Sequence, residues 1–458
     1  MIPVTTTTDT KYVFPFREIS HIINRTQRHL ERNIEHYIEK NLEIETAVVE
    51  SGYIDKDYLI DYSGYYSRSF QELGRFTERI HFFSSRFTQD EFEETMMNAD
   101  LEKLDSLKKN YKGFIIIKPF RCTDGNPSPS LGRALLIVPD SELCDCKYIY
   151  CKNKVSLFGI PLEINTLPFQ PQDHAVAACA TIALWITNNK MRELFQTPSY
   201  SPFEITKKAS SLIENGRSLP PEGLSNRQML NFIKDVGLDY NVVGVSKHAT
   251  QCKKNTGYQK KYKDLVTVTI KAFLHADIPI IGNLILHNKD TGEANAHSVV
   301  ISGYKTDTNG EIIQIYVHDD NFGPYREISS ISPYMDFYKW DCDWQKLGRY
   351  TDVSVDELII PLYPKIRLYY NDVYEYYKQL AKDEKHYENQ YMLYFTTIKN
   401  YKNMLLDKEV DNKIDFLKKS MPRFIWVIAT KVNGSIVRED LYDAVSHYMR
   451  KETTVIFG

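Results

Sequence analysis

The side chains with the clearest chemical potential follow one another along the chain in the order cysteine, histidine, aspartate. Cys179 begins the apolar run CATIALWIT, His297 begins HSVVISGY, and Asp319 and Asp320 end IYVHDD. A cysteine nucleophile needs a histidine to relay its proton and an acid or amide to orient the imidazole. A helix beginning at Cys179 would also favour the thiolate, because the N-terminal end of a helix carries partial positive charge.

The histidine and the aspartates are predicted to meet through a hairpin. HSVVISGY and IIQIYVHDD read as two strands joined by KTDTNGE, a turn rich in Asp, Asn and Gly. Because a hairpin returns the chain to its start, His297 and Asp319 are expected to lie side by side. Asp320 is the alternative to Asp319 as the third member.

Two glutamines precede the cysteine and supply candidate donors for an oxyanion. Gln170 and Gln172 lie nine and seven residues before Cys179. Attack on a carbonyl places negative charge on oxygen, and a side-chain amide or backbone N–H can stabilise that charge. Either glutamine could serve on this reasoning.

The stretches QPQDHAVAACATIALW, AHSVVISGY and YVHDDNFGPY together resemble the papain-like cysteine peptidases. They are most similar to the bacterial branch that removes double-glycine leader peptides, and to its stand-alone relatives. The resemblance covers residues 167–335. It implies a papain-like core in which an N-terminal helix carries the cysteine and an antiparallel sheet carries the histidine and the aspartate.

Matched to the family motifs, Cys179 is the nucleophile, His297 the base and Asp319 the orienting acid. The family places its glutamine six residues before the cysteine. Here that position holds Asp173, so Gln172, one residue further out, is expected to face the oxyanion. Asp320 replaces a proline that usually follows the third residue, and Ala296 stands where glycine often precedes the histidine.

Each of these residues also has a purely structural interpretation. A cysteine among small apolar residues is commonly buried, and a pair of aspartates commonly ends a strand. His174 and His318 are expected to be structural or exposed. Cys144, Cys146 and Cys151 in CDCKYIYC lack the CxxC pairs of a zinc site, and alternation along a strand explains their spacing. No metal site and no cofactor are predicted.

Composition limits the classes of protein that fit. The 458 residues carry 57 basic and 60 acidic side chains, a net charge of -3, so nucleic acid binding has no electrostatic support. No apolar run approaches the length of a membrane span, and the N-terminus lacks the pattern of a secretory signal. Seven cysteines without framework spacing favour a reducing compartment. A cytoplasmic protein is predicted.

The predicted fold class is α+β in three parts. Residues 1–165 are expected to form an N-terminal α+β domain, 166–360 the papain-like domain, and 361–458 a small C-terminal α/β extension. Periodicity and caps predict the individual elements. The expected helices are 19–38, 89–104, one after Cys179, one after Ser225, 263–276, 372–396 and 438–450; the expected strands are 111–120, 132–140, 278–287, 297–304, 312–320 and 423–430.

The predicted function is hydrolysis of a peptide or isopeptide bond by a thiol nucleophile, with a protein or peptide as substrate. The same residues also suit an acyltransferase or deamidase of the transglutaminase type, because an acyl-thioester accepts amines as well as water. A catalytically inactive papain-like interaction module is the third possibility. The N-terminal domain is a candidate surface for a partner protein, since the 32 tyrosines suit protein recognition.

Overall fold

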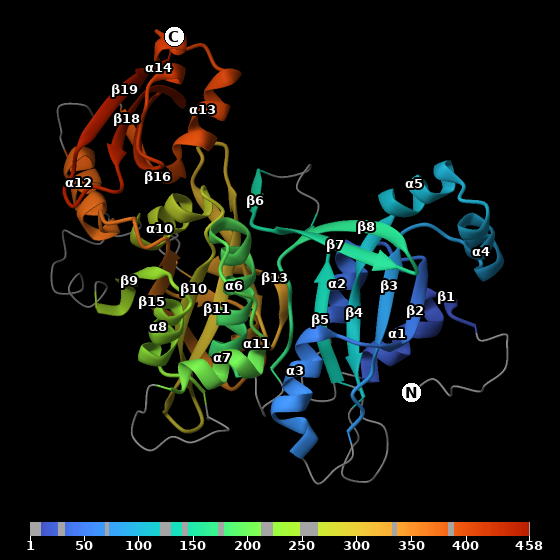
Figure 1. Cartoon of the computed structure of the whole chain (residues 1–458). Helices are drawn as coiled ribbons and strands as arrows, with labels where there is room; N and C mark the ends of the chain where they lie inside the picture. The colour runs from blue at the N-terminus through green and yellow to red at the C-terminus, as the bar shows by residue number, and fades with distance from the viewer. Residues whose placement is uncertain are drawn as a thin grey trace.

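The computed structural model describes ten segments of the chain. They are residues 11–25, 33–68, 73–119, 130–139, 145–172, 178–211, 223–247, 264–331, 337–382 and 389–457. Helices and antiparallel sheets gather into three groups in chain order, as Figure 1 shows. The mixed α+β class predicted from the sequence is therefore confirmed.

The N-terminal group is a five-stranded antiparallel sheet in the order β1-β2-β3-β4-β5. Its strands are β1 (Val13–Pro15), β2 (Thr46–Tyr53), β3 (Thr77–Phe83), β4 (Tyr111–Lys118) and β5 (Ser130–Leu136). Both faces of β4 are buried, which explains its unbroken run of apolar residues. Ile115 and Ile117 pack on one side, and Phe114 and Ile116 on the other.

Helices and a hairpin cover the two faces of this sheet. The covering helices are α1 (Phe16–Arg25), α2 (Asn33–Asn41), α4 (Gln89–Met97) and α5 (Leu101–Lys109). By contrast, α3 (Lys56–Gly64) and the short η1 (Tyr66–Arg68) pack into the core of the central group described below. The hairpin consists of β7 (Cys151–Leu157) and β8 (Ile160–Thr166). Apolar residues of α1 and α2 share the cluster of Ile115, while those of α4, α5 and the hairpin share the cluster of Phe114.

One of the expected long helices consists of two shorter ones. The prediction of one helix over 89–104 was wrong because Asp100 interrupts it: its side chain accepts hydrogen bonds from the backbone N–H groups of Glu102 and Lys103 and so starts α5. Ala99 has a positive φ of 48° at the same point. The helix expected over 19–38 matches α1 and α2 where the chain is described, and residues 26–32 lie outside the described part.

The central group is an eight-stranded antiparallel sheet. The order is β14-β13-β12-β11-β10-β15-β9, and β6 pairs with β11. The strands are β6 (Cys146–Tyr148), β9 (Asp239–Gly244), β10 (Ile280–Asn288), β11 (Ala294–Thr306), β12 (Ile312–Asp319), β13 (Gly323–Ser330), β14 (Trp340–Asp341) and β15 (Tyr350–Leu362). The expected strands 278–287, 297–304 and 312–320 correspond to β10, β11 and β12. β6 reaches this sheet from residues assigned by sequence to the N-terminal domain.

Helices lie around the central sheet, and α10 and much of α6 are buried. The helices are α6 (Cys179–Phe195), α7 (Pro202–Ala209), α8 (Asn226–Asp235), α10 (Asp264–Leu274) and α11 (Asp343–Lys346). α6 contacts β10 and β11 and is buried on nearly all sides, which fits its apolar sequence. α8 begins, as predicted, at a capping box in which Ser225 and Gln228 bond to each other's backbone N–H groups.

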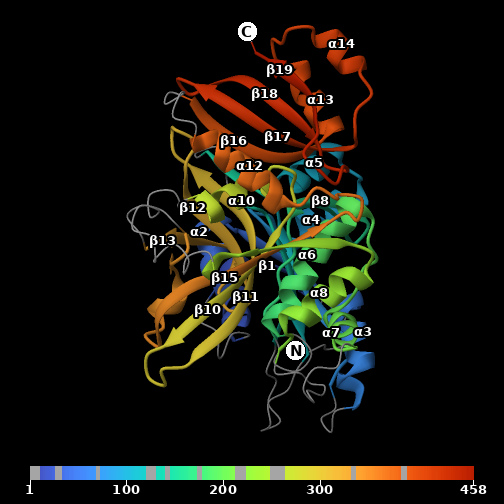
Figure 2. The same ribbon diagram turned by 90° about the vertical axis from the view of Figure 1, so that its left-hand side faces the viewer.

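The C-terminal group is a four-stranded sheet with three helices, and it lies beyond α10 in Figures 1 and 2. Its elements are α12 (Tyr370–Lys382), β16 (Asn389–Thr397), α13 (Ile398–Leu406), α14 (Lys413–Lys418), β17 (Phe424–Val432), β18 (Ser435–Asp443) and β19 (Lys451–Ile456). The expected helix over 372–396 corresponds to α12 up to Lys382 and is wrong from Asn389, where β16 begins; residues 383–388 lie outside the described part of the chain. The expected helix over 438–450 was wrong.

A two-residue turn explains the second error. Asn433 and Gly434 both have positive φ, 51° and 82°, as a tight hairpin turn requires. The turn brings the chain back along β17, and β18 pairs with that strand over its whole length. No helix in the described part of the chain is both long and apolar enough to cross a bilayer.

Two buried histidines make the fold acid-sensitive. Burial lowers the pKa of His81 to about 4 and that of His318 to about 3, so both are neutral in the folded protein at mild acidity. A histidine in the unfolded chain has a pKa near 6.5. The free energy of unfolding is therefore greatest above that pH and decreases as the pH falls toward the pKa values of the folded protein. At about pH 5 we expect each to cost roughly 2 kcal/mol of unfolding free energy, measured by urea titration.

His81→Gln tests this at one site, because glutamine can still bond to Tyr111 and Glu50, the partners of both ring nitrogens. The variant should lose less stability between neutral and acid pH than the wild type. The exposed His447 provides the control, and His447→Gln should leave the pH dependence unchanged. An unaltered pH dependence in His81→Gln would contradict the assignment.

Candidate active site

Cys179 is the first residue of α6 and lies at its positive end. Ala178 is the N-cap residue and has no side-chain acceptor for the first-turn N–H groups, and the first turn holds no acidic residue. The positive potential of the helix terminus is therefore left for the thiol. Cys179 is also only partly buried, whereas Cys151 and Cys342 are buried and their pKa is raised by burial to about 12.

His297 projects from β11 and connects the cysteine to the acids. It is 5% exposed, and its Nε2 lies 3.1 Å from Asp319 Oδ1. The ring also lies next to Cys179, which contributes to its electrostatic surroundings. Because Nε2 is taken by the carboxylate, Nδ1 is the ring nitrogen left for the thiol.

The charges around His297 favour the imidazolium. Burial acts to lower the pKa of the ring, but the charge and hydrogen bond of Asp319 and the contact with Cys179 outweigh it. The pKa of His297 therefore lies well above its ordinary value. An imidazolium held next to a thiol at a helix N-terminus is the arrangement that stabilises a thiolate.

Asp319 ends β12 and is fixed by three donors. Besides His297, the backbone N–H of Asn321 donates a hydrogen bond to Oδ1, and the indole N–H of Trp344 donates one to Oδ2. Both donor–acceptor distances are 3.0 Å. The hairpin predicted from sequence is present: Asp307 and Gly310 form its turn, and β11 and β12 pair beyond it. It brings the histidine and the aspartate together as expected.

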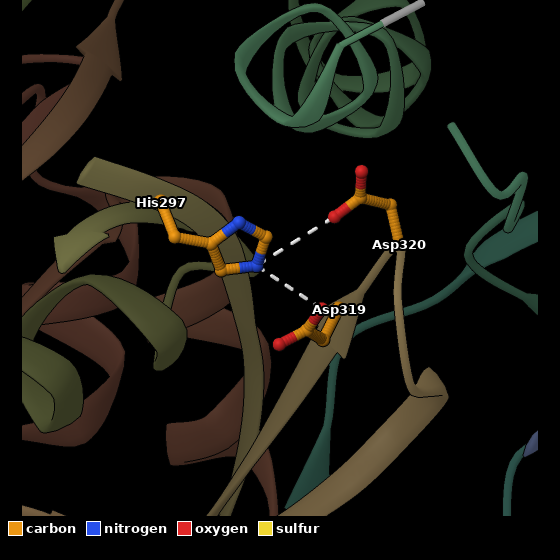
Figure 3. A group of neighbouring side chains, drawn as sticks. All are labelled: His297, Asp319 and Asp320. Atoms are coloured by element: carbon orange, nitrogen blue, oxygen red, sulfur yellow. Dashed lines mark hydrogen bonds and ion pairs between the residues drawn. The ribbon is translucent and has the colours of Figure 1, made fainter. Parts of the chain in front are cut away.

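Asp320 lies at the same ring nitrogen as Asp319. Its Oδ1 is 3.6 Å from Nε2 of His297, and the residue is 3% exposed. Figure 3 shows the two carboxylates reaching one nitrogen, Asp319 from the end of β12 and Asp320 from the start of the following loop. Burial raises the pKa of Asp320 to about 7, in spite of the nearby imidazolium. Asp319 is the closer, better-supported partner of the ring.

The two glutamines have different surroundings. The Gln172 amide donates to Asn321 Oδ1 over 2.9 Å, so this residue lies next to the loop that carries the aspartates. Gln170 is 2% exposed, and its Nε2 has no hydrogen-bond partner among the described residues. Both stand on the segment that leads towards α6, and residues 173–177 lie outside the described part of the chain.

Trp344 is a component of the site that sequence reasoning missed. It stands on the short helix α11, and its ring packs edge-on against His297 with centroids 4.8 Å apart. The indole therefore both donates to Asp319 and covers one side of the histidine. Nothing in the run WDCDWQKLGR signals this contact, because Trp344 meets the site only through the pairing of β13 with β14.

The remaining candidates lie away from this cluster or outside the described residues. His318 is buried and bonds through Nδ1 to Ser302 Oγ over 2.9 Å, which fits the structural role expected of it. His174 and Cys144 are not among the described residues. Cys146 is disulfide-bonded, with its partner also outside them, and Cys151 is free and buried. The disulfide runs counter to the reducing compartment expected from the cysteine spacing.

No protein-family model matches the chain, and no curated protein matches its sequence. What the chain does must therefore be inferred from the chemistry of the cluster around His297.

Removal of the indole N–H should weaken the orientation of the histidine. We expect Trp344→Phe to slow alkylation of Cys179 by iodoacetamide roughly fivefold, the rate equivalent of losing one hydrogen bond of about 1 kcal/mol. Mass spectrometry of the labelled peptide measures the rate. Trp340→Phe is the matched control, because that indole donates to the Phe337 carbonyl instead. Equal effects of the two changes would show that Trp344 acts only through stability.

Proposed function

We propose that this chain is a cysteine peptidase or isopeptidase that uses Cys179, His297 and Asp319. The observation that carries the proposal is the proximity of three groups: the His297 ring is hydrogen-bonded to the Asp319 carboxylate, and the Cys179 thiol lies next to the same ring. The nucleophile stands at a helix N-terminus, the base lies on the adjacent strand, and the acid fixes the ring from the far side. Each group thus has the neighbour that its role requires.

The first half of the reaction forms a thioester. The Cys179 sulfur attacks the carbonyl carbon of the substrate, a C–S bond forms, and the carbonyl electron pair moves to oxygen. When that pair returns, the C–N bond breaks and the leaving amine takes the proton from His297 Nδ1. Asp319 holds the ring in the orientation needed for this transfer.

The second half returns the enzyme to its starting state. Water attacks the thioester carbonyl and gives a proton to His297, the C–S bond breaks, and the acid product leaves. The sulfur departs as a thiolate beside the newly formed imidazolium. An amine in place of water would give acyl transfer, and water attacking the thioester of a glutamine side chain would give deamidation.

A papain-like core is part of the proposal. α6 carries the cysteine and packs against an antiparallel sheet that carries the histidine and the aspartate on adjacent strands. This is the layout implied by the sequence resemblance. The N-terminal and C-terminal sheets flank it, and we propose that they select a protein or peptide substrate.

Thiol reactivity tests the proposal without knowledge of the substrate. At about pH 6 iodoacetamide should label Cys179 well ahead of the other free cysteines, because an unperturbed thiol near pKa 8.5 is almost wholly protonated there. His297→Ala should abolish this selectivity, since the imidazolium supplies the charge next to sulfur. Asp319→Ala should reduce it only in part, because the acid orients the ring. His447→Ala, at an exposed histidine, is the control.

The outcomes separate the three classes of function. Uniform labelling of the cysteines, or labelling unchanged in His297→Ala, would indicate an inactive interaction module. Selective labelling together with cleavage of peptides from a proteome-derived library supports the peptidase. Selective labelling with amine incorporation or deamidation, and no cleavage, would replace hydrolysis of peptide bonds by transglutaminase-type chemistry.

Turnover of a cleaved peptide then identifies the oxyanion donor. We expect Gln172→Ala to lower kcat by about 10²-fold, because loss of one oxyanion donor costs that much or more. Alkylation of Cys179 should be unaffected, since iodoacetamide reacts at a saturated carbon and develops no oxyanion. Gln170→Ala is the matched comparison and should retain turnover. The reverse pattern would assign the oxyanion to Gln170.

A further inference from the structure

The proposed triad needs one carboxylate, yet two lie at the same nitrogen of His297. The exposed fractions of His297, Asp319 and Asp320 are 5%, 4% and 3%, so all three are withdrawn from water. Asp319 has the indole of Trp344 and the backbone of Asn321 as additional partners. By contrast, Oδ2 of Asp320 is buried and has no hydrogen-bond partner among the described residues. The peptidase chemistry gives this second acid no role.

The spacing of the three side chains is that of ligands around a small cation. One ligand atom from each lies within 4.8 Å of the other two, and no other such group of three occurs among the described residues. The separations from Nε2 are 3.1 Å to Asp319 and 3.6 Å to Asp320. Ligands about 2.1 Å from a tetrahedral Zn²⁺ ion lie roughly 3.4 Å apart, so little movement would be needed.

We infer that His297, Asp319 and Asp320 bind a divalent transition-metal ion of the Zn²⁺ class, and that the bound ion switches off the thiol chemistry. The second statement rests on the proposed function. One imidazole nitrogen with two carboxylate oxygens suits Zn²⁺ or Co²⁺ better than Mg²⁺, which prefers oxygen ligands and water. The ion would meet Oδ1 of Asp320, the oxygen of this acid that lies near Nε2 of His297.

The residues around the ligands would hold them in place. Trp344 and the Asn321 backbone already orient Asp319 by donating to its two oxygens. The other ring nitrogen of His297 faces Cys179, which fixes the ring plane. Outer partners of this kind set the orientation of ligating carboxylates and histidines in metal sites.

Inhibition follows from the electron pairs of the imidazole. The ion takes the lone pair of Nε2, and the proton that this nitrogen carried passes to solvent. The remaining proton of the neutral ring then lies on Nδ1, which faces the thiol. No lone pair is left to receive the proton of Cys179, so the thiolate cannot form by this route.

Metal binding is measured first in the Cys179→Ser variant, which lacks the proposed nucleophile. We expect Cys179→Ser to bind one equivalent of Co²⁺ with the visible absorption of a tetrahedral site and no thiolate-to-metal band, and Zn²⁺ to displace it. Asp320→Asn, added to this variant, should weaken Co²⁺ binding by about 100-fold. Asp341→Asn, at an exposed aspartate on β14, is the matched control and should bind Co²⁺ as before. Mg²⁺ should not compete.

Absence of saturable Co²⁺ binding in Cys179→Ser, or equal affinity in the Asp320→Asn form, would overturn the inference. Circular dichroism checks that each variant is folded. If Asp320→Asn does not fold, His297→Gln provides the same test, because it removes the nitrogen ligand and must abolish the Co²⁺ absorption.

The effect on the thiol is then measured with Cys179 present. The quantity measured is the rate of iodoacetamide labelling with Zn²⁺ divided by the rate without it. This ratio should be about 0.1 or lower in the wild-type chain. It should be near 1 in Asp320→Asn, because loss of this ligand weakens Zn²⁺ binding about 100-fold. A low ratio in both proteins would mean that zinc acts directly on the sulfur, which overturns the regulatory role. Failure of selective labelling in the metal-free protein would count against the peptidase alone, since binding in Cys179→Ser needs no thiol.

Discussion

The buried contact between His297 and Asp319 is the interaction around which the central part of the molecule is arranged. A charged imidazole withdrawn from water is tolerated only with an acid at hydrogen-bond distance and with further donors to that acid. The first requirement is met because β11 pairs with β12 as far as Val300 and His318, and His297 and Asp319 lie just beyond this pair at the same end of the two strands. The second draws in Trp344 and the backbone of Asn321.

The position of the cysteine depends on the same contact from the other side. α6 is buried on nearly all faces, so its axis is fixed by apolar packing on β10 and β11 rather than by any cap. That packing places Cys179 at the free nitrogen of His297. An uncapped helix start is a cost in an ordinary helix, but here it leaves the positive end of the dipole for the sulfur.

The second carboxylate gives this cluster two possible states. With a proton on Asp320 the acids and the imidazolium come close to electrical balance, and the ring remains available to the thiol. With a divalent ion in place of the protons the balance is also met, but the metal then occupies Nε2 and the ring proton stays on Nδ1, so no lone pair faces the thiol. A single buried cluster can thus support both the proposed reaction and its suppression.

Local pattern was enough to predict the core strands and several helix starts. Some features depend only on residues that are neighbours in sequence, so they could be predicted. They are the apolar runs of β4, β10, β11 and β12, the Ser225 cap and the turn at Asp307. The order of Cys179, His297 and Asp319, with the hairpin, also predicted that the last two would meet. The break before α5 and the hairpin of β17 and β18 also have local sequence signals, at Asp100 and at Asn433–Gly434. The helical periodicity of the surrounding residues predicts a helix across both points.

The rest was decided by contacts between distant segments. Residues 389–396 form β16 because β17 offers a complete ladder to pair with, and periodicity carries no information about that partner. Trp344 reaches Asp319 only because β14 pairs with β13 at the edge of the sheet. Likewise, two adjacent aspartates read from sequence as an ordinary strand end. Their convergence on one buried nitrogen depends on the backbone turning immediately after β12, a geometry that only the packed structure fixes.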